Sequence, residues 1–191
     1  MKIFIYSFLL IIIFSACSSS VEEKINIPTV QKDVLSSDFF PVTNYIKGQI
    51  VEISRNSINP LKIIRTGNKQ DSVWLRVEEL DAAFADFLTP EIDSKNMGGY
   101  FKENKFMDQT LNTFTFTYEP LENLPDSMKL QRWDVYINPE NNTVKRIYLE
   151  KKGPDNKSLQ LTWQANEWCR IASFSNGQTK EKEIFIQWRF D

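Results

Sequence analysis

An alternating run lies near the middle of the sequence: Thr113-Phe114-Thr115-Phe116-Thr117-Tyr118. Side chains along a β-strand point to the two faces of a sheet in turn, so a period of two indicates a strand with one buried face. Similar segments follow it, separated by short stretches rich in Asn, Gly and Pro, and such connections favour antiparallel neighbours. We therefore predict a six-stranded meander, whose later strands span residues 132–138, 143–151, 158–164, 168–175 and 182–190.

The segments before this run have mixed patterns. Apolar residues within 38–54 recur at helical spacing, and residues 79–89 show a second apolar stripe that ends before Pro90. Residues 61–66 and 73–77 have the composition of a hairpin, and residues 94–104 predict a short third helix. The expected fold is α+β: an antiparallel meander of about six strands plus an N-terminal hairpin, curved over two or three helices.

Composition excludes several classes of chemistry. The 191 residues include no histidine and two cysteines, which rules out Ser-His-Asp catalysis, histidine-bound zinc and a four-cysteine zinc site. The 23 basic and 25 acidic side chains are interspersed, which argues against nucleic acid as a partner. No nucleophile or phosphate-binding motif stands out among the remaining residues. We therefore expect no enzyme activity, no cofactor and no bound metal.

The N-terminal segment predicts export and anchoring. Lys2 precedes an apolar run over residues 3–14, which is too short for a bilayer core that needs about 20 residues. Cys17 follows Ser15-Ala16, and the segment resembles a bacterial lipoprotein signal whose cleavage leaves a lipidated cysteine. We predict a signal peptide over residues 1–16, lipidated Cys17 with a tether to residue 38, and one domain over residues 39–191.

This organisation predicts a protein of the cell envelope, held to the outer membrane by lipidated Cys17 and facing either the periplasm or the cell surface. Glu22 and Glu23 are consistent with a surface-export signal and equally with a solvated linker. The expected partners are the membrane itself and an envelope protein, glycan or lipid. Ser72 and Ser127 each follow an aspartate in a short pattern found at O-glycosylation sites.

Register arithmetic assigns side chains to faces of the meander. A loop over residues 139–142 pairs Asn138 with Thr143. One face, interpreted as the core, then holds Trp133, Val135, Ile137, Val144, Arg146 and Tyr148. The other face holds Arg132, Asp134, Tyr136 and Lys145, with Asp134 and Lys145 close enough for an exposed ion pair.

The next hairpin suggests a candidate binding site. A tight turn at Asn166-Glu167 would place Trp163, Trp168 and Arg170 on one face, with Arg170 stacked over Trp163. This group is interpreted either as an aromatic platform for a sugar or peptide, or as part of a core of large rings. Cys169 would lie on the opposite face as a buried, unreactive thiol.

Acidic residues give weaker candidates. The segment from Asp93 to Gly98 lacks the ligands of a calcium loop, so Asp93 or Ser94 is interpreted as a helix cap. The carboxylates of Glu78, Glu79, Asp81 and Asp86 are the acidic groups that a hydrolase could use. Their positions on the polar side of a helix favour simple solvation.

Five short motifs are distributed over the chain: Asp38-Phe39-Phe40-Pro41-Val42, Asp71-Ser72-Val73-Trp74, Leu124-Pro125-Asp126-Ser127, Trp133-Asp134-Val135-Tyr136, and Leu161-Thr162-Trp163 with Trp168-Cys169. Together they resemble an uncharacterised family of Gram-negative lipoproteins, over most of the chain after the signal. The resemblance implies an anchored envelope protein without implying an activity. Our first hypothesis is a non-enzymatic binding or scaffold domain. The alternatives are a carrier with a half-barrel cavity for a lipid and, third, a carboxylate-dependent hydrolase.

Overall fold

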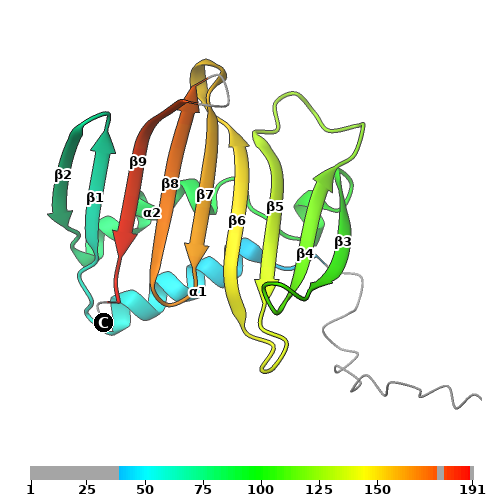
Figure 1. The fold of residues 1–191 in the computed structure, drawn as a ribbon, viewed down its shortest axis with the longest axis horizontal. Coiled ribbons are helices and arrows are strands. Elements are labelled where there is room, and N and C mark those ends of the chain that lie inside the picture. Colours follow the sequence, from blue (N-terminus) through cyan, green and yellow to red (C-terminus); the bar gives the residue numbers. More distant parts are fainter. Residues whose placement is uncertain (1–38, 176–178, 190–191) are drawn as a thin grey trace, which may run out of the picture. The chain divides into compact units, whose positions relative to one another are not determined.

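The computed structural model describes residues 39–175 and 179–189. Within them, nine antiparallel strands form one sheet in the order β2-β1-β9-β8-β7-β6-β5-β4-β3. The helices lie behind this sheet in the view of Figure 1, and no described helix lies across its front face. The predicted signal peptide, Cys17 and the tether lie outside the described residues.

The elements follow one another with short connections. The helices are α1 (Val42–Arg55), the 3-10 turn η1 (Val77–Glu79), α2 (Leu80–Leu88), α3 (Ser94–Met97) and the 3-10 turn η2 (Pro154–Asn156). The strands are β1 (Leu61–Thr66), β2 (Lys69–Trp74), β3 (Phe101–Asp108), β4 (Thr113–Pro120), β5 (Leu130–Ile137), β6 (Val144–Lys152), β7 (Ser158–Gln164), β8 (Trp168–Ser175) and β9 (Thr179–Gln187). The helices predicted over residues 38–54 and 79–89 are confirmed as α1 and α2.

The predicted fold class is wrong, because the described chain is dominated by one nine-stranded sheet. The third predicted helix ends after one turn at Met97, and a further strand, β3, begins at Phe101 and pairs with β4. The N-terminal hairpin also joins the sheet, since β1 pairs with β9 along its whole length. Pairing between segments more than a hundred residues apart has no local sequence signal, so the hairpin was predicted as a separate element.

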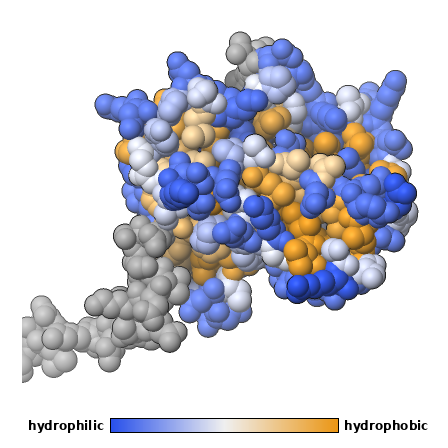
Figure 2. Space-filling view, turned by 180° about the vertical axis from the view of Figure 1, so that it is seen from behind, coloured by the Kyte–Doolittle hydropathy of each residue, from blue (hydrophilic) through white to orange (hydrophobic). Residues whose placement is uncertain are grey.

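The core lies between the sheet and the helices. Trp133 stacks on Tyr118 with ring centroids 4.4 Å apart, and Phe101 meets its edge. Farther along the sheet, Trp163 packs against Phe84 and Phe87 of α2. Figure 2 shows the helix-bearing side, where apolar surface is interrupted by hydrophilic residues. Among the described residues, no helix combines the length and apolarity needed to cross a bilayer.

The face assignment in the β5–β6 hairpin is correct for β5 and for Val144 beside the turn, and wrong farther along β6. Ile137 pairs with Val144, but an irregularity follows, and Tyr136 pairs with Arg146. One extra residue in β6 reverses the facing of everything beyond it. Arg146 and Tyr148 therefore lie on the face away from the helices, while Ile147 and Leu149 enter the core in their place.

Asp134 also differs from its prediction. It is buried and accepts a hydrogen bond from Arg132 at 3.2 Å, and the expected ion pair with Lys145 is not formed. The side chain of Lys145, in the irregular stretch of β6, donates instead to the carbonyl oxygen of Leu111. The bulge therefore changes both the facing of the strand and its charge pairing.

Candidate binding surface

The β7–β8 hairpin separates the residues predicted as a platform. Residues 165–167 form the connection, and Asn166 adopts φ 63°, a left-handed conformation suited to a three-residue loop. With three loop residues instead of two, Gln164 pairs with Trp168 and Trp163 pairs with Cys169. Trp163 therefore faces the helices, and the prediction that it shares a face with Trp168 and Arg170 is wrong.

Trp163 is a core residue. Its side chain is 0% exposed, and its ring also approaches Trp188, with centroids 4.9 Å apart. Arg170 cannot stack over it, because the sheet lies between them. The alternative interpretation of Trp163, packing within a core of large rings, is confirmed.

Cys169 lies directly opposite Trp163 on the core face, and not on the face away from it as predicted. Its predicted burial is confirmed, and this burial raises the pKa of the thiol well above its ordinary value. A buried neutral thiol is a poor nucleophile. Cys169 is therefore a packing residue of the core.

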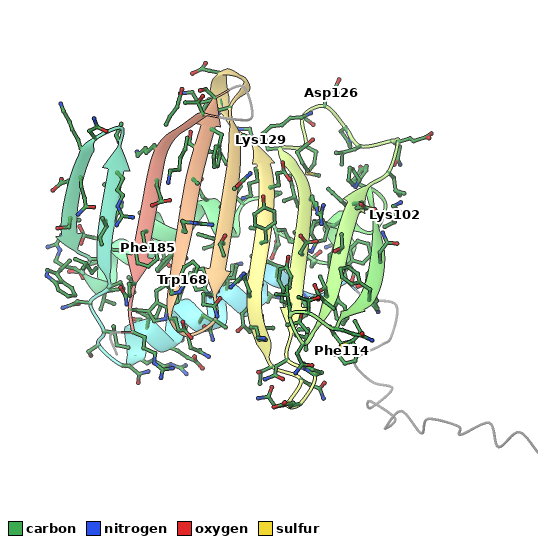
Figure 3. The ribbon with its side chains drawn as sticks, viewed as in Figure 1. Lys102, Phe114, Asp126, Lys129, Trp168 and Phe185 are labelled. Atoms are coloured by element: carbon green, nitrogen blue, oxygen red, sulfur yellow. The ribbon has the colours of Figure 1, made fainter. Side chains whose placement is uncertain are left out.

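Trp168 and Arg170 remain together on the face of the sheet away from the helices, which we call the open face. Trp168 on β8 lies beside Phe185 on β9 in Figure 3, with ring centroids 5.5 Å apart and planes inclined by 37°. Arg170 is exposed and pairs across the strands with Phe185. Arg170 forms no ion pair with any residue in the described part of the chain.

These side chains belong to a line that crosses the entire sheet, which we call the cross-strand row. Successive registers place its members opposite one another: Trp74, Leu61, Gln187, Trp168, Gln164, Arg146, Tyr136, Thr115 and Phe106. Strands in a sheet lie about 4.8 Å apart, so Trp168 is roughly 14 Å from both Trp74 and Tyr136. Single rings therefore alternate along the row with amide and guanidinium groups.

The two ends of the cross-strand row are its most exposed parts. Trp74 on edge strand β2 is 57% exposed, and Phe106 on edge strand β3 is 50% exposed. In the middle, Arg146 donates a hydrogen bond to Gln164 at 3.1 Å. These two residues and Tyr136 also line a pocket of about 90 Å³ beside the row. The row therefore offers both stacking surfaces and a recess with polar walls.

Glu183 forms a paired charge group on the open face. Glu183 lies 2.8 Å from Arg65 and 3.0 Å from Lys180. Burial acts to raise the pKa of Glu183, but hydrogen bonds from Lys180 and Arg65 outweigh it and lower the pKa. The charge of Glu183 is therefore neutralised within this group.

The acidic candidates form no metal-binding group in the part of the chain that the structure describes. Within residues 39–175 and 179–189, no group of three or more potential ligands could hold a metal ion. Glu78, Asp81 and Asp86 are exposed, and Glu79 bonds to Arg76. Asp93 caps α3, as predicted, by accepting a hydrogen bond from the Asn96 amide. Ser72 and Ser127 are exposed, and their glycosylation stays a prediction.

Sequence reasoning missed most members of the cross-strand row. Gln187 and its neighbour Phe185 were placed in a strand. No pattern along the chain connects Gln187 with Leu61 and Trp74, the next members of the row. The available signal was the alternation within each strand, which shows which residues share a face once the strand order is known.

No family model matches the chain, and neither curated proteins nor solved structures give a significant match. The resemblance to Gram-negative lipoproteins therefore stays a prediction. Function is inferred from the surface itself.

Proposed function

We propose that this protein is a non-enzymatic lipoprotein of the cell envelope that binds an extended glycan along the cross-strand row. The observation that carries the proposal is the row itself: rings at roughly 14 Å intervals, alternating with Gln187, Gln164 and Arg146. Aromatic faces pack against the apolar faces of sugar rings, and planar amides and guanidinium groups bond to hydroxyls. A long chain of sugars would meet both kinds of contact repeatedly.

The distribution of polarity favours a glycan over a protein partner. The cores of protein interfaces are contiguous apolar patches depleted of charge. On the open face the rings of Trp168 and Tyr136 are separated by Gln164 and Arg146, and within the described part of the chain Trp168 has Phe185 as its aromatic neighbour. Arg146 and Arg170 on this face form no ion pair within the described part of the chain, so their guanidinium groups are available to bond to hydroxyls.

The proposed anchor is Cys17. A lipidated cysteine followed by a tether over residues 18–38 would hold the domain near the outer membrane, where envelope glycans are abundant. Replacing Cys17 with Ala tests this part alone. We expect the variant to lose membrane fractionation and to keep the unprocessed mass, and a mature variant that stays in the membrane fraction would contradict the anchor.

Glycan binding is tested with purified full-length protein on immobilised polysaccharides from Gram-negative envelopes. Trp168→Ala should weaken retention by about tenfold, because the central stacking surface is lost. Adding Tyr136→Ala to this variant should weaken retention further. Val51→Ala, at an exposed position on α1, is the matched control and should bind as the unmodified protein does. Equal retention of Trp168→Ala and Val51→Ala would refute the proposal.

A further inference from the structure

The pocket beside the cross-strand row combines two positive charges with a buried hydroxyl. It lies on the open face, at the end of the sheet that carries the β3–β4 and β5–β6 turns (Figure 1). Its walls come from Leu111, Thr113, Tyr136, Lys145, Arg146 and Gln164, and we call it the row pocket. Its volume of about 90 Å³ is roughly that of three water molecules in the liquid. The row pocket therefore has room for one substituent of a sugar, while the sugar ring stays outside on the row.

The irregularity in β6 brings both positive charges to this pocket. The register shift lies between the pairs formed by Val144 and Arg146, and it leaves Lys145 as the extra residue. In a bulge two residues of one strand oppose a single residue of the other, so Lys145 and Arg146 both lie opposite Tyr136. In a regular strand successive side chains point to opposite faces, and one of the two cations would leave the pocket.

Both cations are available to a ligand. Lys145 and Arg146 are exposed, and neither forms an ion pair within the described part of the chain. Their hydrogen bonds go to neutral groups: Lys145 Nζ donates to the Leu111 carbonyl oxygen at 3.5 Å, and Arg146 Nε donates to Gln164 Oε1 at 3.1 Å. No acidic residue is among the described side chains that line the pocket. The pocket is therefore positively charged.

Hydroxyl groups complete the wall of the pocket. Thr113 is 2% exposed, and its Oγ1 has no hydrogen-bond partner among the described residues. A buried hydroxyl without a partner is costly, so an acceptor on a ligand that reaches it is favoured. Burial, and after it the charge of Asp134, raises the pKa of Tyr136, so that its phenol stays protonated and can donate. The carboxylate of Asp108, which also acts on Tyr136, is held by two amides of the β3–β4 turn.

We propose that the row pocket binds the carboxylate of a uronic acid, so that the glycan on the cross-strand row is an acidic one. This inference rests on the proposed function and names its substrate class. The planar guanidinium of Arg146 matches the two oxygens of a carboxylate, and Lys145 supplies a second charge. The hydroxyl of Thr113 then gains the acceptor that it lacks.

Other occupants match only part of the pocket. A hydroxymethyl or acetamido group of a neutral sugar would leave both cations without a counter-charge. A sulfate ester supplies charge but is bulkier than the space of about three waters. The pocket is also not the predicted half-barrel cavity for a lipid, since the space under α2 is filled by Phe84, Phe87 and Trp163.

A second guanidinium on the open face suits a polymer that is acidic along its length. Arg170 forms no ion pair in the described part of the chain. Its strand, β8, lies two strands from β6, so roughly 10 Å separate Arg170 from Arg146 across the sheet. A polyuronate that fills the row pocket presents further carboxylates toward Arg170.

The test is isothermal titration calorimetry of purified full-length protein with oligogalacturonate and with oligomannuronate. Each is compared with the same oligosaccharide after reduction of its carboxyl groups to hydroxymethyl groups. At least one acidic form should bind about tenfold more tightly than its reduced form, and added salt should diminish this preference because it screens the charges. Equal affinity of acidic and reduced forms would overturn the inference and leave the glycan proposal standing.

Failure to bind either acidic form is also decisive. If the protein is still retained on immobilised envelope polysaccharides, the present inference alone is wrong. If that retention is absent as well, both proposals are wrong. Competition by dextran sulfate as strong as competition by the acidic oligosaccharide would contradict the assignment of a carboxylate.

Charge variants locate the preference in the pocket. Lys145→Gln/Arg146→Gln should reduce the preference for the acidic form from about tenfold to about twofold or less. Arg55→Gln/Lys95→Gln makes the same charge change at exposed positions on α1 and α3, and should keep the full preference. An equal loss in both double variants would indicate an effect of net charge and would contradict the pocket.

Thr113→Val tests the buried hydroxyl without changing charge. It should weaken binding of the acidic form about fivefold. The melting temperature should stay equal or rise, because an unsatisfied buried hydroxyl is removed. Thr117→Val makes the same change at a buried hydroxyl outside the pocket and should keep the affinity. Unchanged affinity of Thr113→Val would contradict the role of its hydroxyl in the site.

Discussion

Trp163 and Trp168 lie in the two strands of one hairpin, yet their side chains point to opposite faces of the sheet. The left-handed Asn166 in the three-residue connection causes this separation. Trp163 consequently stabilises the core, and Trp168 belongs to the surface that we propose binds a glycan.

The two tryptophans should therefore respond differently to truncation. Trp163→Ala removes a fully buried ring in contact with Phe84, Phe87 and Trp188, and should lower the free energy of unfolding by about 3–5 kcal/mol. Trp168→Ala should lower it by about 1 kcal/mol or less, because its ring is partly solvated and contacts mainly Phe185. Urea denaturation followed by circular dichroism measures both, and losses of equal size would contradict the face assignment.

Tyr118 should contribute to stability through its hydroxyl. This buried group donates to Glu103 at 2.5 Å and accepts from the Phe40 amide at 3.0 Å, joining the chain before α1 to the sheet. Tyr118→Phe removes both hydrogen bonds, leaves the Phe40 amide without this partner, and should lower the free energy of unfolding by about 1–3 kcal/mol. Tyr136→Phe on the open face is the matched control, and an equal effect there would argue against the role of Tyr118.

Lys151 should make stability depend on pH in the alkaline range. Burial lowers the pKa of its ammonium group from 10.5 to about 8, so the folded state disfavours the charged form. This penalty is fully present below pH 8 and is relieved between pH 8 and 10.5, where the unfolded chain holds a proton that the folded chain has released.

The consequence is measurable by comparing the protein with Lys151→Met. The free energy of unfolding of the unmodified protein, relative to that variant, should increase by up to ~3 kcal/mol between pH 8 and pH 10.5. Lys69→Met controls for the loss of one positive charge from an exposed position. A difference that stays constant with pH would show that the Lys151 amine is not desolvated.

Cys169 should be protected from thiol reagents in the native protein. Burial both blocks access and raises the pKa of the thiol, so modification requires unfolding. Mass spectrometry of the peptide containing Cys169 should find the label only after denaturant is added. Rapid labelling without denaturant would indicate that this part of the core opens readily.

The strands that sequence reasoning placed well are those with strict alternation. In β4 the rings of Phe114, Phe116 and Tyr118 face the helices and the threonines face away, because each pairs with the corresponding face of β5. Strand β3 was missed because Gly98 and Gly99 follow a helix-like segment, and its own residues are mostly polar and exposed. An edge strand with little burial has a weak hydrophobic pattern.

The hairpin turns explain why the candidate site was only half predicted. A connection over residues 67–72 was expected between the first two strands, but Thr66 pairs with Lys69 around a two-residue turn with Gly67 at φ 55°. One residue more or less in a turn reverses the facing of a whole strand. The prediction that Trp168 and Arg170 share a face of the sheet is therefore correct, and the prediction that Trp163 shares that face is wrong.

The sequence by itself determined the alternation within most strands, the amphipathic faces of α1 and α2, and the absence of histidine chemistry, because these depend on residue types and short spacings. Only the tertiary structure decided that β1 and β2 extend the sheet beyond β9, and with them the cross-strand row from Trp74 to Phe106. This arrangement depends on pairing between distant segments and on single-residue shifts at turns and bulges. Those are set by the packing of the whole domain and leave no periodic trace along the chain.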